Sequence, residues 1–115
     1  MRGSSRERFE ELVVEALDGL PRWVQERLDN VEVLVEDVPP SGERLLGLYE
    51  GIPLTQRGGG YFGVLPDRIT LFKRSIEAVA GNEDDLRRIV AHTVVHEFAH
   101  FFGISDDRLR ELDRY

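Results

Sequence analysis

Apolar residues recur at helical spacing near the start of the chain. Within residues 5–20 they fall three and four positions apart, and Ser5 stands where a helix N-cap belongs. Gly19 and Pro21 interrupt the pattern, and Pro21 suits the first turn of a second, short helix over residues 21–28. The repeating apolar positions of the first helix are Phe9, Leu12, Val13, Ala16, Leu17 and Leu20.

Three segments in the middle of the chain have the pattern of β-strands. Residues 31–36 alternate apolar and acidic side chains, which predicts a half-buried strand, and residues 44–50 and 68–72 are the other two candidates. The intervening residues 51–66 are rich in glycine and proline, so we expect a loop there, with a short extended piece at residues 61–64.

The longest predicted helix begins after Asn82. Asn82 is a good N-cap, the three acidic residues that follow complement the helix dipole, and Gly103 suits the left-handed residue that ends a helix. A short helix over residues 74–80 precedes it, and a last one starts at Asp106 or Asp107. The pattern predicts an α+β fold: two N-terminal helices and a small sheet of three or four strands packed against the long helix.

Composition narrows the class of protein. A length of 115 residues suits a single domain over residues 1–115, and 41% hydrophobic with 32% charged residues is typical of a globular protein. The net charge of −7 argues against nucleic acid or membrane as a partner. The absence of cysteine excludes disulfides, thiolate zinc sites and cysteine nucleophiles. The N-terminal residues are polar, so we expect no signal peptide and a cytoplasmic protein.

The predicted long helix contains His96-Glu97-Phe98-Ala99-His100. Residues four apart on a helix are separated by about 6 Å along its axis and lie on one face, so two imidazoles at this spacing can bind one metal ion. Glu97 lies at the edge of the same face, where it is placed as the general base for a water that the metal activates. This spacing therefore predicts a zinc (Zn²⁺) site with metal ligands His96 and His100 and catalytic Glu97.

A catalytic zinc ion usually has three protein ligands. Gly103 can end the helix in a left-handed conformation, and the reversed chain then returns Asp106 to the metal; Asp107, one residue further along, remains an alternative. His92 extends the histidine row, but it is about 12 Å along the helix from His100, so we interpret it as a structural residue or one that supports the ligands.

The pattern from His96 to Asp106, HExxHxxGxxD, resembles the extended metzincin signature with aspartate as third ligand, as in the snapalysins. Further stretches at residues 31–38, 45–53, 65–69 and 94–108 are similar to the small bacterial minimal zincin-like metallopeptidases. The resemblance implies a mixed sheet beside the active helix, zinc at His96, His100 and Asp106, Glu97 as base, and an edge strand able to pair with an extended peptide.

Two features depart from the metzincin pattern. The methionine turn is absent, because Met1 is the only methionine, and nine residues follow Asp106, so we expect a minimal substrate cleft. An oxyanion-stabilising tyrosine has three candidates, for each of which packing is the favoured role; they are Tyr49, Tyr61 and Tyr115. The glycines at 58–60 lack a Walker lysine and are interpreted as a loop or flap near the metal.

Three functional hypotheses remain from the sequence. The first is a zinc-dependent metallopeptidase that hydrolyses short peptides or unfolded protein. The second is a non-catalytic zinc-binding module that recognises a peptide or protein partner. The third is an active site that a partner subunit completes.

Overall fold

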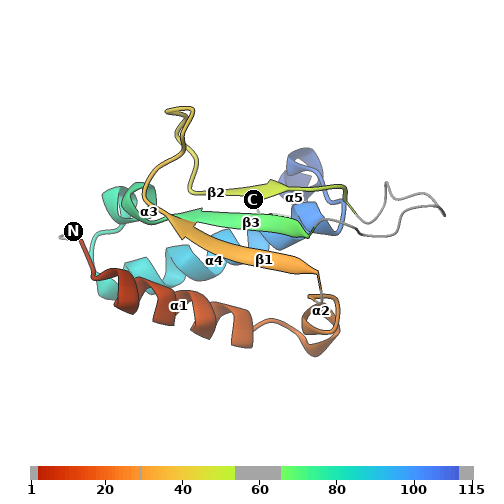
Figure 1. Cartoon of the computed structure of the whole chain (residues 1–115), viewed down its shortest axis with the longest axis horizontal. Coiled ribbons are helices and arrows are strands. Elements are labelled where there is room, and N and C mark those ends of the chain that lie inside the picture. Colours follow the sequence, from red (N-terminus) through yellow and green to blue (C-terminus); the bar gives the residue numbers. More distant parts are fainter. Residues whose placement is uncertain (1–2, 29, 54–65, 112–115) are drawn as a thin grey trace.

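The computed structural model describes residues 3–28, 30–53 and 66–111, in which helices pack against one face of a three-stranded sheet (Figure 1). The elements, in chain order, are α1 (Arg6–Asp18), α2 (Arg22–Gln25), β1 (Val31–Glu36), β2 (Gly47–Glu50), β3 (Asp67–Phe72), α3 (Lys73–Val79), α4 (Glu83–Phe101) and α5 (Asp106–Glu111). The predicted α+β fold, with a small mixed sheet and one long helix, is confirmed. None of the helices in the described ranges has the length and hydropathy needed to span a bilayer.

The strand order is β1-β3-β2. β1 runs parallel to β3 with Val33 opposite Ile69, and β2 runs antiparallel to β3 with Tyr49 opposite Ile69. All residues of β3 except Arg68 are buried, as a strand with neighbours on both sides requires. β1 and β2 are therefore the edges of the sheet that the described residues form, which the sequence pattern left open.

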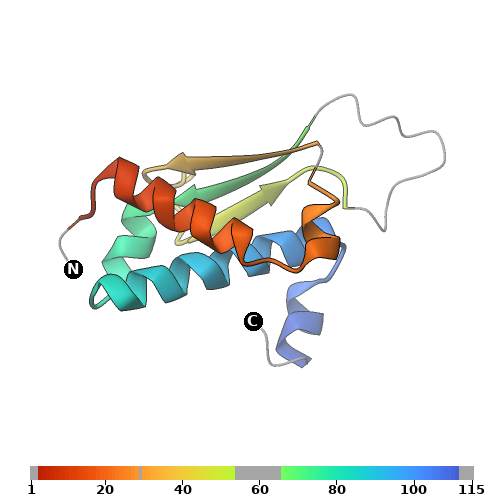
Figure 2. The same cartoon turned by 90° about the horizontal axis from the view of Figure 1, so that it is seen from below.

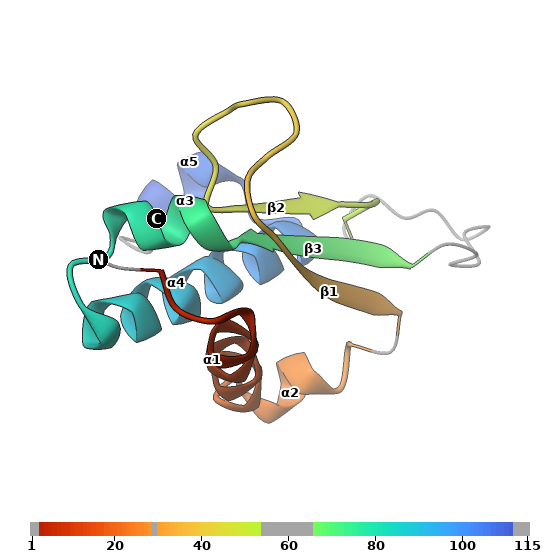
Figure 3. The same cartoon turned by 60° about the vertical axis from the view of Figure 1, so that its left-hand side comes forward.

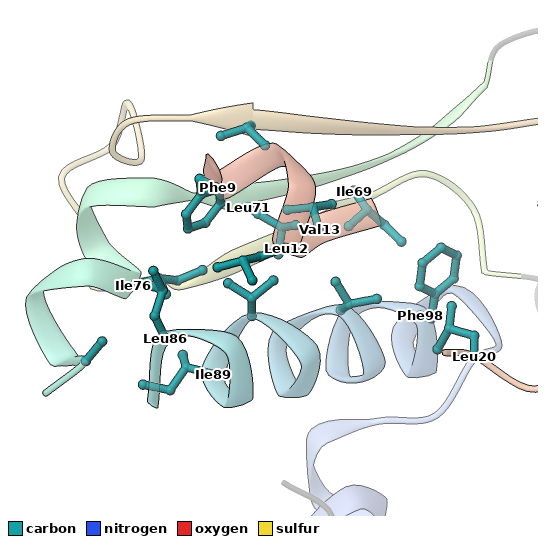
Figure 4. Packing of buried hydrophobic residues seen from close by; sticks show 14 of the residues in the cluster. Phe9, Leu12, Val13, Leu20, Ile69, Leu71, Ile76, Leu86, Ile89 and Phe98 are labelled. Carbon is teal, nitrogen blue, oxygen red and sulfur yellow. The ribbon is translucent and has the colours of Figure 1, made fainter. Parts of the chain in front are cut away.

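Helices α1 and α4 lie side by side on the same face of the sheet (Figure 2). Their apolar stripes and the inward face of β3 meet in one core. Complete burial of each large apolar side chain contributes about 1.5–3 kcal/mol to the stability of this packing. Figure 4 labels side chains of this core, among them Phe9, Leu12, Val13, Ile69, Leu71, Ile76, Leu86, Ile89 and Phe98. This packing holds α4 beneath the sheet and determines which of its faces stays accessible.

The ends of α4 are those that the sequence predicts. At its N-terminus the side chain of Asn82 accepts a hydrogen bond of 2.8 Å from a backbone N–H of the first turn. At its C-terminus Gly103 has φ 88°, its N–H donates to the carbonyl of His100, and Ile104 donates to Ala99, both at 2.9 Å. This is the Schellman motif, and it reverses the chain immediately after the histidines.

Some predicted boundaries differ from the structure. α2 is shorter than the predicted residues 21–28, because the hydrogen bonds that follow it join residues three rather than four apart, Arg27 to Val24 and Leu28 to Gln25. β2 begins at Gly47 rather than at residue 44, because the loop from β1 rises away from α1 and α4 before it reaches the sheet (Figure 3). The loop joins the sheet at Leu46, whose carbonyl accepts a hydrogen bond from the backbone N–H of Phe72. The extended piece predicted at residues 61–64 lies outside the described residues.

Candidate metal centre

Three side chains bring their donor atoms together at the C-terminal end of α4. Nε2 of His96 and Nε2 of His100 lie 3.1 Å apart, and Oδ1 of Asp106 lies 3.3 Å from the first and 2.9 Å from the second. The donor atoms of a tetrahedral zinc ion with bonds of about 2.0–2.1 Å are separated by about 3.3 Å. The triangle thus has the dimensions that one such ion needs, and within the described ranges these residues form the group able to hold it.

Local structure explains why these three residues meet. His96 and His100 are one turn apart on α4, and the Schellman turn at Gly103 reverses the chain so that the first residue of α5 faces them. Asp107, the alternative ligand from the sequence, is exposed and does not belong to the group. His92 is also exposed, and its ring centroid lies 6.3 Å from that of His96.

The chemistry of the donor set fits a cation. Oδ1 of Asp106 is buried and makes no hydrogen bond of acceptable geometry within the described part of the chain, although two imidazole nitrogens lie beside it. A buried acceptor without a partner is unfavourable, and a shared cation would remove that cost. Burial and the neighbouring His100 lower the pKa of His96 despite Asp106, so its imidazole is neutral near pH 7 and offers a lone pair.

Glu97 lies next to the triangle and is only 7% exposed. Its burial raises the pKa of the carboxyl to about 7; the backbone N–H of Tyr49 opposes the rise, and the charge of Asp106 adds to it. A carboxyl with a pKa near 7 exchanges protons readily near neutral pH. The hydrogen bond from Tyr49 also links the carboxyl of α4 to strand β2.

Glu97 and the three donor residues line a cavity of about 400 Å³ between β2 and the end of α4. Its further walls come from Leu45, Gly47, Leu48, Tyr49, Pro53, Gly103, Ile104 and Ser105. The sequence pattern predicts the α4 side of this cavity but not the β2 side. The only signal was Gly47, since a glycine within a strand pattern often marks a close backbone approach.

Gly47 brings the backbone of β2 into close contact with α4. A Cβ on this residue would lie 2.8 Å from Cγ2 of Thr93, 3.1 Å from Cγ of Glu97 and 3.2 Å from the carbonyl oxygen of Thr70. Real Cβ contacts are longer than the first of these, so a side chain at residue 47 would force the strand and the helix apart. The absence of a side chain therefore allows β2 to lie directly over the HExxH segment.

The hydroxyl of Tyr49 is held at the other edge of the site. It donates to Oδ2 of Asp67 at 2.8 Å, and Asp67 is only 2% exposed. Gly51, with φ 154°, leaves room for this pair, because a Cβ there would lie 2.7 Å from the Asp67 carboxyl. The side chain of Tyr49 is thus anchored by a hydrogen bond to a buried carboxylate. The other two candidate tyrosines, Tyr61 and Tyr115, and the glycines at 58–60 lie outside the described residues.

Comparison with known proteins agrees with the fold and the motif. The sequence profile of the zincin-like metallopeptidases matches residues 28–115. A solved structure of a conserved hypothetical protein from T. thermophilus superposes with a TM-score of 0.62 at 31% identity, covering 86% of this chain and 94% of the other. Among curated proteins, none matches this chain. The profile match spans both sides of the cavity and the donor residues, and on this ground the chain belongs to the zincin-like metallopeptidase family.

Proposed function

We propose that this protein is a zinc-dependent peptidase acting on short or unfolded peptides, with His96, His100 and Asp106 as metal ligands and Glu97 as general base. The observation that carries the proposal is the triangle of donor atoms, 2.9–3.3 Å on a side, in one cavity with the buried carboxyl of Glu97. Family membership supports a metallopeptidase-type function.

The metal ligands, Glu97 and Tyr49 have different roles in the proposed hydrolysis. A bound zinc ion supplies Lewis acidity, which polarises a peptide carbonyl and increases the acidity of water. Glu97 takes the proton from the attacking water and then delivers it to the leaving amine. The backbone N–H of Tyr49 keeps the carboxyl of Glu97 oriented during these transfers.

Strand β2 supplies the means to position a peptide. It is an edge strand of the sheet that the described residues form, and it lines the cavity, so an extended peptide that pairs with its outer side would pass the donor atoms. Backbone pairing recognises any extended segment, which suits a hydrolase of short or unfolded peptides. Folded proteins offer few such segments.

The first experiment measures zinc content and peptide cleavage in the same preparations. Wild-type protein should contain about one zinc ion per chain and cleave members of a peptide library, with products identified by mass spectrometry. Glu97→Gln removes the base without changing the size of the side chain, so it should retain zinc and lose turnover by at least about 100-fold. Cleavage by Glu97→Gln at the wild-type rate would refute the mechanism.

One observation favours a second function, a zinc-binding module without catalysis. The donor atoms come from both α4 and α5, so a metal ion would tie these helices together. The same preparations distinguish the two functions. A protein that binds zinc, melts at a lower temperature after chelation and cleaves nothing in the library would support the module, whereas zinc-dependent cleavage would exclude it.

A further inference from the structure

A second cavity, of about 270 Å³, adjoins the metal centre towards the N-terminal half of α4. It shares four of its wall residues with the first cavity; they are Leu45, Gly47, His96 and Glu97. The walls that belong to the second cavity alone are Arg44, Leu46, His92 and Thr93. The two cavities share walls and are therefore neighbours; together they are called the cleft between β2 and α4, and the candidate metal centre belongs to the first of them.

Arg44 differs from most of the arginines because its charge has no partner among the described residues. It is exposed, and the described residues contain no ion pair or hydrogen bond to its guanidinium. Most of the other described arginines form ion pairs, namely Arg6, Arg8, Arg22, Arg68, Arg74, Arg87 and Arg88. In a chain with a net charge of −7, an unpaired guanidinium on a cavity wall is available to a ligand. Its planar fork of N–H donors matches a carboxylate in two-point contact.

The surroundings of Arg44 favour an anion as well. His92 lies on the same cavity wall and is exposed, and an imidazole offers an N–H donor in either neutral tautomer. The hydroxyl of Thr93 already donates its proton to the carbonyl of Ile89 at 2.8 Å, so it is not a further donor for the ligand. Glu97 is the one acidic residue among the described walls of the second cavity, and its carboxyl accepts from the backbone of Tyr49.

We infer that Arg44 and His92 form a subsite that binds a carboxylate of the substrate, so that the preferred substrates are peptides with an acidic group near the scissile bond. The inference deepens the proposed function and rests on it. His92 precedes His96 and His100 by one and two helical turns, about 6 and 12 Å along the axis, which corresponds to about two to four residues of extended peptide. The carboxylate therefore lies about two to four residues from the scissile carbonyl, either on a side chain or at a free C-terminus.

The test compares peptides that differ only in a carboxylate. One series moves a single glutamate along a neutral peptide with a C-terminal amide, with glutamine as the matched residue, and a second series exchanges the amide for a free acid. The two series distinguish a side-chain carboxylate from a terminal one. Binding is measured by fluorescence anisotropy to zinc-loaded Glu97→Gln protein, and cleavage by mass spectrometry with otherwise wild-type protein.

The decisive variants are Arg44→Gln and a matched control, Arg27→Gln. Arg27 is also exposed and without an ion pair in the described part of the chain, but it lines neither cavity. Its substitution removes the same single positive charge as Arg44→Gln does, without changing the proposed subsite. We expect the parent protein, which is Glu97→Gln with Arg44 and Arg27 unchanged, to bind the carboxylate peptide about fivefold to tenfold more tightly than its neutral match. Arg44→Gln should abolish the preference and Arg27→Gln should keep it. The preference should also weaken as salt screens the pair.

Each outcome bears on a different claim. A preference that survives Arg44→Gln, or no preference in the parent protein, overturns the subsite. An Arg44-dependent preference in binding with no cleavage of any peptide supports the subsite and counts against the proposed hydrolysis. A failure to bind any peptide overturns both.

Discussion

Gly47 offers the sharpest test of how β2 and α4 are joined. In Gly47→Ala the new methyl group would lie 2.8 Å from Cγ2 of Thr93, a methyl group on the buried face of α4. Thr93→Ser removes that methyl and keeps the hydroxyl that donates to Ile89. The two substitutions therefore form a double-mutant cycle, in which Thr93→Ser makes room for the new methyl group of Gly47→Ala.

The expected magnitudes follow from packing. Overfilling a close-packed contact costs about 1–3 kcal/mol of unfolding free energy, so we expect about 2 kcal/mol for Gly47→Ala. Removing the buried methyl in Thr93→Ser costs about 1 kcal/mol. In the double variant the alanine methyl occupies the vacated space, and only the contacts of 3.1 Å to Glu97 and 3.2 Å to Thr70 remain tight. The double variant should thus be more stable than the sum predicts by about 1–2 kcal/mol.

Urea unfolding of the four proteins gives the coupling energy, and thermal melts should show a shift of about 4 °C per kcal/mol. Gly81→Ala is the control, since its Cβ would meet only the Asp85 carboxyl at 3.7 Å and the change should stay within about 0.5 kcal/mol. If the effects of Gly47→Ala and Thr93→Ser add to within about 0.5 kcal/mol, the close contact between strand and helix is wrong.

Two further predictions concern charge and metal. Burial raises the pKa of Glu77, but hydrogen bonds from Ser4 and Lys73 outweigh it and lower the pKa overall. Glu77→Gln should therefore lower the free energy of unfolding by about 2 kcal/mol near pH 7. Because the folded-state pKa is the lower one, urea titrations should find this difference complete above pH 4.5 and shrinking at more acidic pH; a constant difference would contradict it. Chelation should lower wild-type stability by about 3 kcal/mol if zinc exceeds its dissociation constant 100-fold, and calorimetry should find no such effect in His100→Ala.

Much of the helical half of the site is predictable because its determinants are local. Asn82 and Gly103 mark the ends of α4 through hydrogen bonds within a few residues, and both ends are confirmed. Helical periodicity alone places His96 and His100 on one face. The return of Asp106 also depends on a local turn, so the donor triangle was within reach of the sequence.

The strand half of the site depends on contacts between distant segments. The patterns of residues 31–36 and 68–72 predict strands, but they do not specify their neighbours. The order β1-β3-β2 and the edge position of β2 among the described strands therefore come only from the tertiary structure. The contact of Gly47 with α4 and the position of Arg44 over the cleft follow from that order. The sequence by itself determined the candidate metal-ligating motif, because helix geometry repeats every few residues. The fold alone decided what lies opposite it, because strand pairing joins residues that the chain keeps far apart.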